Sequence, residues 1–192
     1  MMDRRIKKTR NEIKHALLEL SSKKGINQVS VQNIVDHANI NRATFYYHYK
    51  DKKDLVDKIE EETLEGLIQE IRLPDDQIKT FEDIVYHSIL ASLEHVKNCE
   101  DVYTILLSDN GIMNFRSKML DTIKKSIRES FEPLEKKNIK IINDKSYLVN
   151  FIAGAHLSVI IDWVNTGLDK EPTSLAKQMA SILTEGVKVK FH

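Results

Sequence analysis

The spacing of apolar residues predicts helices along nearly the whole chain. Ile13, Leu17 and Leu20 recur at intervals of four and three residues, which places them on one face of a helix over about residues 3–24. No stretch alternates between apolar and polar residues in the way that indicates a strand. The same criterion predicts further helices over about 31–38, 42–48, 51–73, 77–97, 102–109, 111–132, 143–167 and 173–189. The prolines lie near predicted helix boundaries, at Pro74, Pro133 and Pro172.

Short polar residues indicate where the early helices begin and turn. Ser30 is placed to cap the second helix and Asn41 to cap the third. Asn39 lies between these two helices, and asparagine tolerates the left-handed backbone of a tight turn. Asp51 opens a fourth helix, with Asp54 three residues later as in a capping box.

Aromatic, histidine and lysine side chains crowd the third helix and the residues after it. Phe45 and Tyr49 are four residues apart, so both should face the core. Tyr46, Tyr47 and His48 should then point to other faces, toward solvent. So many polar-tipped rings beside lysines favour a binding surface over a packed core.

Two short helices joined by "ANIN" form a candidate helix-turn-helix. In this motif the second helix enters the major groove, and its first residues, here Arg42, Ala43 and Thr44, reach base edges. Tyrosine hydroxyls and an imidazole suit phosphate oxygens. Lys52, in the first turn of the next helix, and Ser30, at the cap of the second helix, are further candidates for phosphate contacts.

The charge distribution supports a polyanionic partner. Residues 1–53 contain 12 Lys and Arg against 5 Asp and Glu, a net charge of +7, whereas residues 54–192 contain 17 against 24, a net charge of −7. A basic N-terminal third on an acidic body is the charge pattern expected of a nucleic-acid-binding head. The alternative is an uneven distribution of charge without function.

The segment "SVQNIVDHANINRATFYYHYKDKKDLV" resembles the signature of the TetR family of transcriptional regulators. Thr44, Phe45, Tyr46, His48, Tyr49, Lys52 and Leu55 fall in register with the family pattern. Asn39 stands where glycine is usual, and Tyr49 replaces the usual phenylalanine. The tail "FIAGAHLSVIIDWVNTGLDKEPTSLAKQM" resembles a C-terminal domain common in Firmicutes members.

The resemblance implies an all-α regulator with two parts. A three-helix DNA-binding head, residues 1–52, is joined by a long fourth helix to a helical ligand-binding and dimerisation body, residues 53–192. It also implies phosphate contacts by Thr44, Tyr46, His48 and Lys52, and base readout by Arg42, Ala43 and Tyr47.

The last two predicted helices are candidates for a homodimer interface. Apolar residues cover most of the circumference of 147–164, more than one core face requires. A helix merely buried within one chain is the alternative. The interface candidates are Leu148, Ile152, Ala155, Val159, Leu175, Met179, Ile182 and Leu183.

A small-molecule pocket is expected between helices of the body, where polar groups fall at apolar positions. The polar groups at such positions are Tyr86, His87, His95, Tyr103, Tyr147, His156, Asp162 and Trp163. The candidate ligand-binding residues are Tyr86, His87, Tyr103, Phe115 and Trp163. Residues such as Trp163 and Tyr147 lie more often in a core or an interface than around a ligand. His87, His95 and Cys99 are spaced by eight and four residues, but satisfied histidines and an inert thiol explain them more simply than a metal site. We therefore expect no metal and no cofactor.

The sequence predicts a cytoplasmic, ligand-responsive repressor that binds a double-stranded DNA operator as a homodimer. The single cysteine, Cys99, suits a reducing compartment, and the N-terminus shows no signal-peptide pattern. Polar residues interrupt the longest apolar stretch, which favours a buried helix over a membrane span. The competing interpretation is a small all-α enzyme or a ligand carrier with a vestigial head, although we find no catalytic motif. A third is a regulator that responds to protein partners and has no small ligand.

Overall fold

Helices make up the computed structural model, which describes residues 4–71, 80–108, 114–136 and 144–187, with side chains omitted for 132–136. No strand occurs in these ranges, and the all-α prediction is confirmed. The chain divides into two compact units. The head unit comprises Met1–Thr63 and Asp101–Phe115, and the body unit comprises Leu64–Glu100 and Arg116–His192. The predicted boundary at residue 52 differs from this division, since the first turns of the fourth helix and the later segment belong to the head unit.

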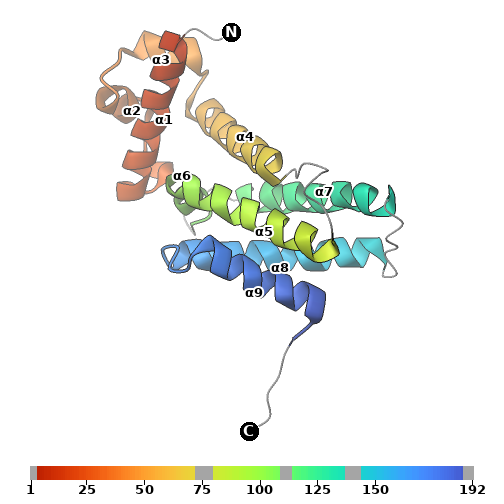
Figure 1. Cartoon of the computed structure of the whole chain (residues 1–192). Helices are drawn as coiled ribbons and strands as arrows, with labels where there is room; N and C mark the ends of the chain where they lie inside the picture. Colours follow the sequence, from red (N-terminus) through yellow and green to blue (C-terminus); the bar gives the residue numbers. More distant parts are fainter. Residues whose placement is uncertain (1–3, 72–79, 109–113, 137–143, 188–192) are drawn as a thin grey trace. The chain divides into compact units, whose positions relative to one another are not determined.

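The head unit is built from short helices packed on a longer one (Figure 1). Its core contains fully buried side chains from separate elements, among them Ile13, Leu17, Ile34, Phe45 and Leu55. The long helix α1 packs against both η1 and α2, and α2 in turn packs against α3. These contacts hold α3 in position. The elements are α1 (Arg4–Lys24), the 3₁₀ turn η1 (Ile26–Gln28), α2 (Val31–His37), α3 (Arg42–His48), the beginning of α4 (Lys52–Ile71) and most of α6 (Glu100–Leu106).

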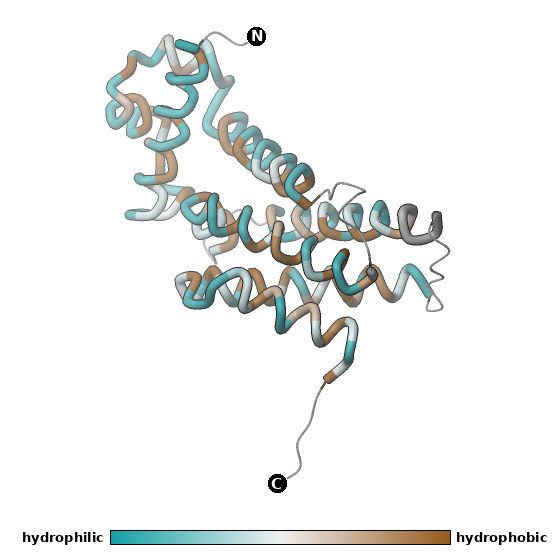
Figure 2. Tube along the Cα trace, viewed as in Figure 1, coloured by the Kyte–Doolittle hydropathy of each residue, from teal (hydrophilic) through white to brown (hydrophobic). Residues whose placement is uncertain are grey.

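The body unit consists of four long helices that lie side by side, together with the end of α4 (Figure 1). They are α5 (Phe81–Asn98), α7 (Phe115–Lys136), α8 (Lys145–Asn165) and α9 (Pro172–Glu185). Hydrophobic and hydrophilic residues are interleaved along them (Figure 2). The apolar residues meet in a core that includes Leu93, Val96, Met119 and Ile160. The body therefore has a hydrophobic core of its own.

The predicted caps and turn of the head are confirmed. The Ser30 hydroxyl accepts a hydrogen bond from the Asn33 N–H at 3.1 Å, and the Asn33 side chain accepts one from the Ser30 N–H. The Asn41 side chain accepts from the Thr44 N–H at 2.7 Å. Asn39 has a φ of +50°, in the left-handed region. Local residue chemistry thus sets the ends of both short helices.

Several predicted boundaries were wrong. The last helix, expected to end at residue 189, ends at Glu185, and the helix expected over 102–109 ends at Leu106. The helix expected to end at residue 132 continues through Pro133 to Lys136. Proline removes one backbone donor from the helix, and here α7 ends within one turn after it. The helix expected to begin at residue 102 begins at Glu100. Pro74, expected just after the fourth helix, lies outside the described residues.

Asn39 offers a direct test of the turn. Replacing it by alanine should lower the free energy of unfolding by about 1 kcal/mol, because a Cβ without a compensating polar group is strained in the left-handed region. Asn39→Gly should be neutral or stabilising, since glycine adopts this backbone freely. Urea unfolding followed by circular dichroism measures both, with Asn27→Ala as a matched control at ordinary φ. Equal losses in the alanine and glycine variants would contradict the backbone argument.

Candidate nucleic-acid interface and body cavity

The turn between α2 and α3 is closed by backbone hydrogen bonds. The Ile40 N–H donates to the Val35 carbonyl at 3.0 Å, and the Asn39 N–H donates to the Asp36 carbonyl at 3.3 Å. Lys24, in the last turn of α1, donates from Nζ to Asn33 Oδ1 at 2.7 Å. Since Asn33 is also part of the cap of α2, this bond ties the start of α2 to the end of α1.

The short helix α3 presents two different faces. Phe45 is completely buried, and Tyr49, directly after the helix, is almost so. Arg42, Ala43, Tyr46 and Tyr47 are exposed, and their spacing places them on one side of the helix. The buried rings anchor α3 to the head, and the exposed group forms a continuous surface that we call the α3 surface.

Within the α3 surface, Arg42 and Tyr46 form a pair. The Arg42 guanidinium lies 5.7 Å from the centre of the Tyr46 ring and donates a hydrogen bond to its hydroxyl at 3.3 Å. Tyr47, the next residue, is 74% exposed. A planar guanidinium on an exposed side chain, with donors left unused, is suited to guanine edges or to phosphate.

Thr44 and Ser30, both predicted to contact DNA, are part of the helix caps. The Thr44 hydroxyl donates to Asn41 Oδ1 at 2.9 Å, and the side chain is half-buried. Ser30 is exposed. A hydroxyl used once still has lone pairs or a donor for a second partner. Both residues can therefore cap a helix and meet a phosphate.

The expected exposure of His48 was wrong. Its side chain is only 9% exposed and packs beside the rings of Tyr47 and Tyr49. Burial, and next the positive charge of Arg10, lowers the pKa of the His48 imidazole, which keeps the ring neutral at pH 7. The sequence could not reveal the burial of His48, because it depends on how distant residues pack around Tyr49. Arg10 of α1 is one of them, and its guanidinium lies over the Tyr49 ring.

Lys52 fastens α4 to the loop after α1. Its Nζ donates to the carbonyl of Ile26 at 3.0 Å and to that of Asn27 at 3.3 Å. Partial burial lowers the pKa of this ammonium group. An ammonium has three donors, so one N–H is left for a phosphate. Lys52 therefore combines a structural role with the predicted binding role.

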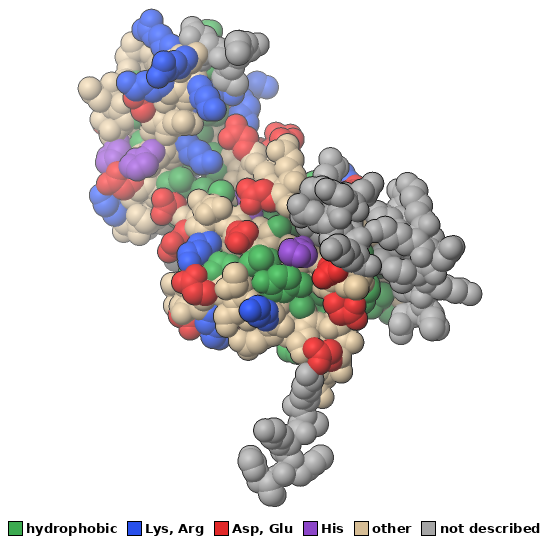
Figure 3. Space-filling model, in the orientation of Figure 1, with side chains coloured by type: hydrophobic (Ala, Val, Ile, Leu, Met, Phe, Trp, Pro, Cys, Tyr) green, Lys and Arg blue, Asp and Glu red, His purple; other side chains and the backbone are tan. Residues whose placement is uncertain are grey.

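Positive side chains gather on the head. Figure 3 shows several Lys and Arg side chains on the visible face of the head, and Asp and Glu interspersed with fewer Lys and Arg on the visible face of the body. This distribution agrees with the excess of basic residues in the N-terminal third of the sequence. The head accordingly offers a favourable potential for a polyanion.

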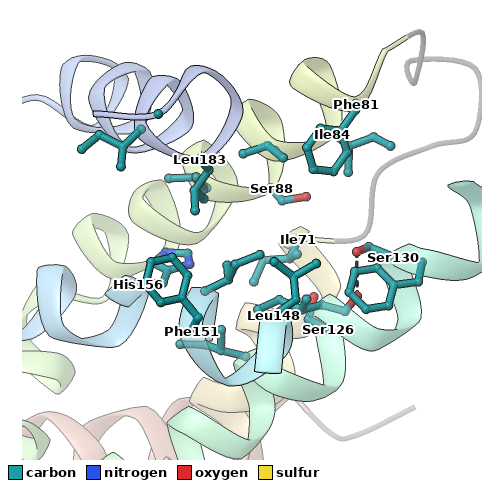
Figure 4. Close-up of a pocket in the computed structure, with 18 of the residues that line it drawn as sticks. Ile71, Phe81, Ile84, Ser88, Ser126, Ser130, Leu148, Phe151, His156 and Leu183 are labelled. Carbon is teal, nitrogen blue, oxygen red and sulfur yellow. Dashed lines mark hydrogen bonds between the residues drawn. The ribbon is translucent and has the colours of Figure 1, made fainter. Parts of the chain in front are cut away.

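The body unit contains a cavity of about 540 Å³ (Figure 4). Residues of α5, α7, α8 and α9 line it, together with Ile71, the last residue of α4. A cavity of this volume is typical of a site for a small organic molecule. Most of its lining is apolar, for example Phe81, Ile84, Ile123, Ile127, Leu148 and Phe151.

Among the described residues that line the cavity, the polar side chains are those of Ser88, Ser126, Ser130 and His156. The Ser130 hydroxyl donates to the Ile127 carbonyl at 2.7 Å. His156 is 7% exposed, and its Nε2 has no hydrogen-bond partner. Burial lowers the pKa of His156 to about 4. The imidazole is therefore neutral at pH 7.

None of the five residues predicted to bind a ligand lines this cavity. Tyr86 and His87 are half-buried and pack edge to face. Tyr103 and Phe115 are completely buried in the head unit, with ring centres 6.0 Å apart. Trp163 is buried and donates from Nε1 to the Lys170 carbonyl at 3.1 Å.

The missed cavity serines carried a detectable signal. Ser126 and Ser130 share the apolar face of α7 with Ile123 and Ile127, at intervals of three and four residues. A serine on an otherwise apolar stripe indicates either a bond to its own helix or a polar partner in a cavity. The helix was predicted from its apolar spacing alone, without regard to these serines.

The eight predicted interface residues fall into different environments. Leu148, Ile152, Ile182 and Leu183 line the cavity. Ala155 is exposed, Val159 and Met179 are half-buried, and Leu175 is buried in its own chain. Tyr147, expected in a core or an interface, is 79% exposed, and Phe151, which was not among the candidates, is 67% exposed. With exposed Gly154 and Ala155 they form one face of α8, here called the α8 face.

The composition of α8 sets it apart among the described helices. It alone among them is long and apolar enough to cross a membrane, judged by length and composition only. Of its most apolar window, 39% is buried within the chain. Much of an apolar helix is thus left at the surface of a single chain.

The histidine and cysteine spacing in α5 does not bring a metal-binding group together. His95 Nδ1 lies 3.2 Å from a carboxylate oxygen of Glu70. Within the described ranges, no three His, Cys, Asp or Glu side chains are placed to hold a metal ion.

Fold and site define an all-α helix-turn-helix protein whose second helical unit encloses a cavity. Two family models match the chain. One, described as the C-terminal region of transcriptional regulators, matches residues 83–185, and the other, bacterial regulatory proteins of the tetR family, matches residues 13–59. The chain belongs to the TetR family of bacterial transcriptional regulators.

Individual relatives agree with this assignment. The chain is 25% identical to the uncharacterized HTH-type transcriptional regulator YxbF of Bacillus subtilis, over 95% of this chain and 46% of that protein. The fatty acid degradation regulator FadR of Bacillus halodurans has a similar fold, with a TM-score of 0.75, 18% identity and coverage of 95% and 97% of the two chains. FadR of Bacillus subtilis, solved in complex with stearoyl-CoA, gives a TM-score of 0.70, 18% identity and coverage of 92% and 98%. The chain spans 46% to 65% of the length of the curated relatives it matches.

The buried His156 should make stability depend on pH. Its pKa is about 4 in the folded chain and 6.5 when unperturbed, so between these values only the unfolded state takes up the proton. The free energy of unfolding therefore carries no penalty from His156 above pH 6.5. It falls by about 3 kcal/mol as the pH is lowered from 6.5 toward 4.

Urea unfolding of the wild type and of His156→Leu across this pH range measures the effect. The free energy of unfolding of the wild type should fall relative to that of the variant as the pH decreases. His156→Gln, which also cannot take up the proton, should follow the leucine variant. Parallel pH profiles for all three proteins would show that His156 does not titrate in this way.

Proposed function

We propose that this protein is a cytoplasmic, sequence-specific repressor that binds operator DNA as a homodimer and responds to a small molecule. The observation that carries the proposal is the α3 surface, four exposed residues on the second helix of a capped helix-turn-helix. That helix is the one which enters the major groove in proteins with this motif.

On the α3 surface, Arg42, Ala43 and Tyr47 are proposed to read bases. Arg42 can bond guanine in bidentate fashion, and the Ala43 methyl can meet the methyl group of thymine. Tyr46, Thr44, Ser30 and the free donor of Lys52 are proposed to hold phosphates, which fixes the register of the helix. His48, predicted from sequence to hold a phosphate, is buried and neutral, so we assign it a role in supporting α3 from the head core.

The α8 face supports a homodimer. Two exposed aromatic residues stand beside Gly154 and Ala155, whose small size permits close approach of a second helix. Pairing this face with its copy about a two-fold axis would bury apolar surface that the single chain leaves exposed. Ile182 on α9, also exposed, extends the same proposal to the last helix.

The cavity supports control by a small molecule. Ile71, which lines it, ends the helix that begins with Lys52, the residue fastened to the head loop. A ligand that displaces the end of α4 therefore acts on a continuous helix held at its other end by the head. The stearoyl-CoA complex of a protein with a similar fold is a further reason to expect an effector.

The regulator is favoured over the alternatives for specific reasons. A vestigial head in an enzyme or a carrier would have no need of capped short helices and an exposed arginine–tyrosine pair. A regulator without a small ligand would have no use for a cavity containing an unpaired polar atom. Repression follows if the operator overlaps the promoter, since a bound dimer then excludes the polymerase.

Arg42 tests base readout. Arg42→Ala should weaken binding to the DNA upstream of the protein's own gene by about 1–3 kcal/mol and relax the base preference at one position of each half-site. Lys52→Met should instead weaken binding to all sequences and reduce the salt slope by about one. Gel-shift titrations against operator and random DNA at several salt concentrations separate the two effects.

Arg128→Ala, which removes the same charge from an exposed position of the body, is the control and should bind like the wild type. The proposal fails if the wild type binds the upstream DNA no better than random DNA at physiological salt.

Ala155 tests the dimer. Ala155→Glu would place two like charges near each other in the middle of the paired α8 faces, so the variant should sediment as a monomer and lose operator affinity. Ser117→Glu adds the same charge at an exposed position of α7 and should remain dimeric. A dimeric Ala155→Glu variant at micromolar concentration would place the interface elsewhere.

A further inference from the structure

The cavity also indicates what kind of molecule fills it, an inference that rests on the proposed function and deepens it. Among the described residues that line the cavity, none is Asp, Glu, Lys or Arg. An ion held there would lose its hydration without gaining a counter-charge, which is strongly unfavourable. The lining therefore selects against a ligand whose charge lies inside the cavity.

The apolar part of the lining runs along several helix turns. Leu148, Ile152 and His156 line the cavity from successive turns of α8, which span about 12 Å at 1.5 Å per residue. Figure 4 shows His156 at one end of the labelled group and Ser130 at the other, with Ser88 between them. An elongated molecule with an aliphatic body matches this shape.

One polar atom in this apolar lining has no partner. His156 Nε2 is buried without a hydrogen bond, and His156 lies among the residues of the cavity wall. A buried polar atom without a partner is costly, and such atoms are rare in folded proteins. Nε2 itself has almost no accessible surface in the ring position seen here. A bound molecule toward which the His156 ring turns, and which places a polar group at this nitrogen, would remove this cost.

The chemistry of a neutral imidazole limits which functional groups of a ligand can pair with His156 Nε2. One ring nitrogen donates and the other accepts, and which of them is protonated depends on the tautomer. A hydroxyl group both donates and accepts, so it can pair with Nε2 in either tautomer. A carboxylate only accepts, and it brings a charge that no described residue of the lining neutralises.

We propose that the effector is an uncharged, elongated aliphatic molecule whose hydroxyl group hydrogen-bonds to His156 Nε2. The serine hydroxyls of Ser88 and Ser126 offer second positions for a polar substituent farther along the chain of the ligand. Binding satisfies the buried nitrogen and replaces water along the apolar wall.

Three probes with the same carbon chain test the proposal: decanol, decanoate and decylammonium. Isothermal titration calorimetry at pH 7.5, with thermal unfolding as a second readout, measures their binding to the full chain. Decanol should bind about tenfold or more tightly than either ion. Equal or tighter binding of an ion, or no binding of decanol, would overturn the proposal.

Variants of His156 test the contact itself. His156→Leu should weaken decanol binding about tenfold, and His156→Gln, which keeps a donor and an acceptor, should restore most of it. His87→Leu, a histidine of the same unit outside the cavity, should bind decanol like the wild type. Unchanged decanol affinity in His156→Leu would overturn the contact.

Operator binding is measured on the same preparation without probe. This measurement distinguishes failure of the proposed ligand class from failure of the proposed DNA-binding function. Decanol can fail to bind while specific DNA binding persists, which rejects the ligand class and leaves the regulator intact. Loss of specific DNA binding with selective decanol binding would reject the regulator and support the ligand class.

Discussion

The presentation of α3 depends on the hydrogen bonds that define two helices of seven residues each. Helices this short are not stable alone, because too few hydrogen bonds offset the cost of the first turn. Here Ser30 and Asn41 cap them, Asn39 adopts the left-handed turn between them, and Lys24 and Lys52 fasten neighbouring segments. Phe45 then anchors α3 from within. These caps, contacts and the buried Phe45 together determine where the exposed side chains of Arg42 and Tyr47 lie.

In the body the notable energetic cost is that of His156 Nε2, a polar atom left unpaired among apolar side chains. A packed core would place an aliphatic residue at position 156 and close the space. The chain instead keeps a neutral histidine beside a cavity that serines also line. A site that gives up stability in this way is expected where a ligand restores it. The proposed effector would account for both the unpaired nitrogen and the cavity.

Local chemistry could be predicted from sequence, and packing between distant segments could not. The caps at Ser30 and Asn41 and the turn at Asn39 each depend on a few neighbouring residues, so the local sequence is enough to predict them. The burial of His48 and the contacts of Lys52 with carbonyls about two dozen residues earlier depend on tertiary structure. The cavity joins Ser88, Ser126 and His156 from three helices, which no helical periodicity brings together. For that reason the aromatic residues chosen as ligand contacts proved to lie outside it.

The central claim is that the α3 surface of two chains docks into two grooves of one operator. Chemical footprinting of the DNA upstream of the protein's own gene tests it most directly. The account predicts two protected half-sites on one face of the duplex, separated by about one helical turn of 34 Å or a multiple of it. Protection without a two-fold pattern, or none beyond that seen with random DNA, would contradict it.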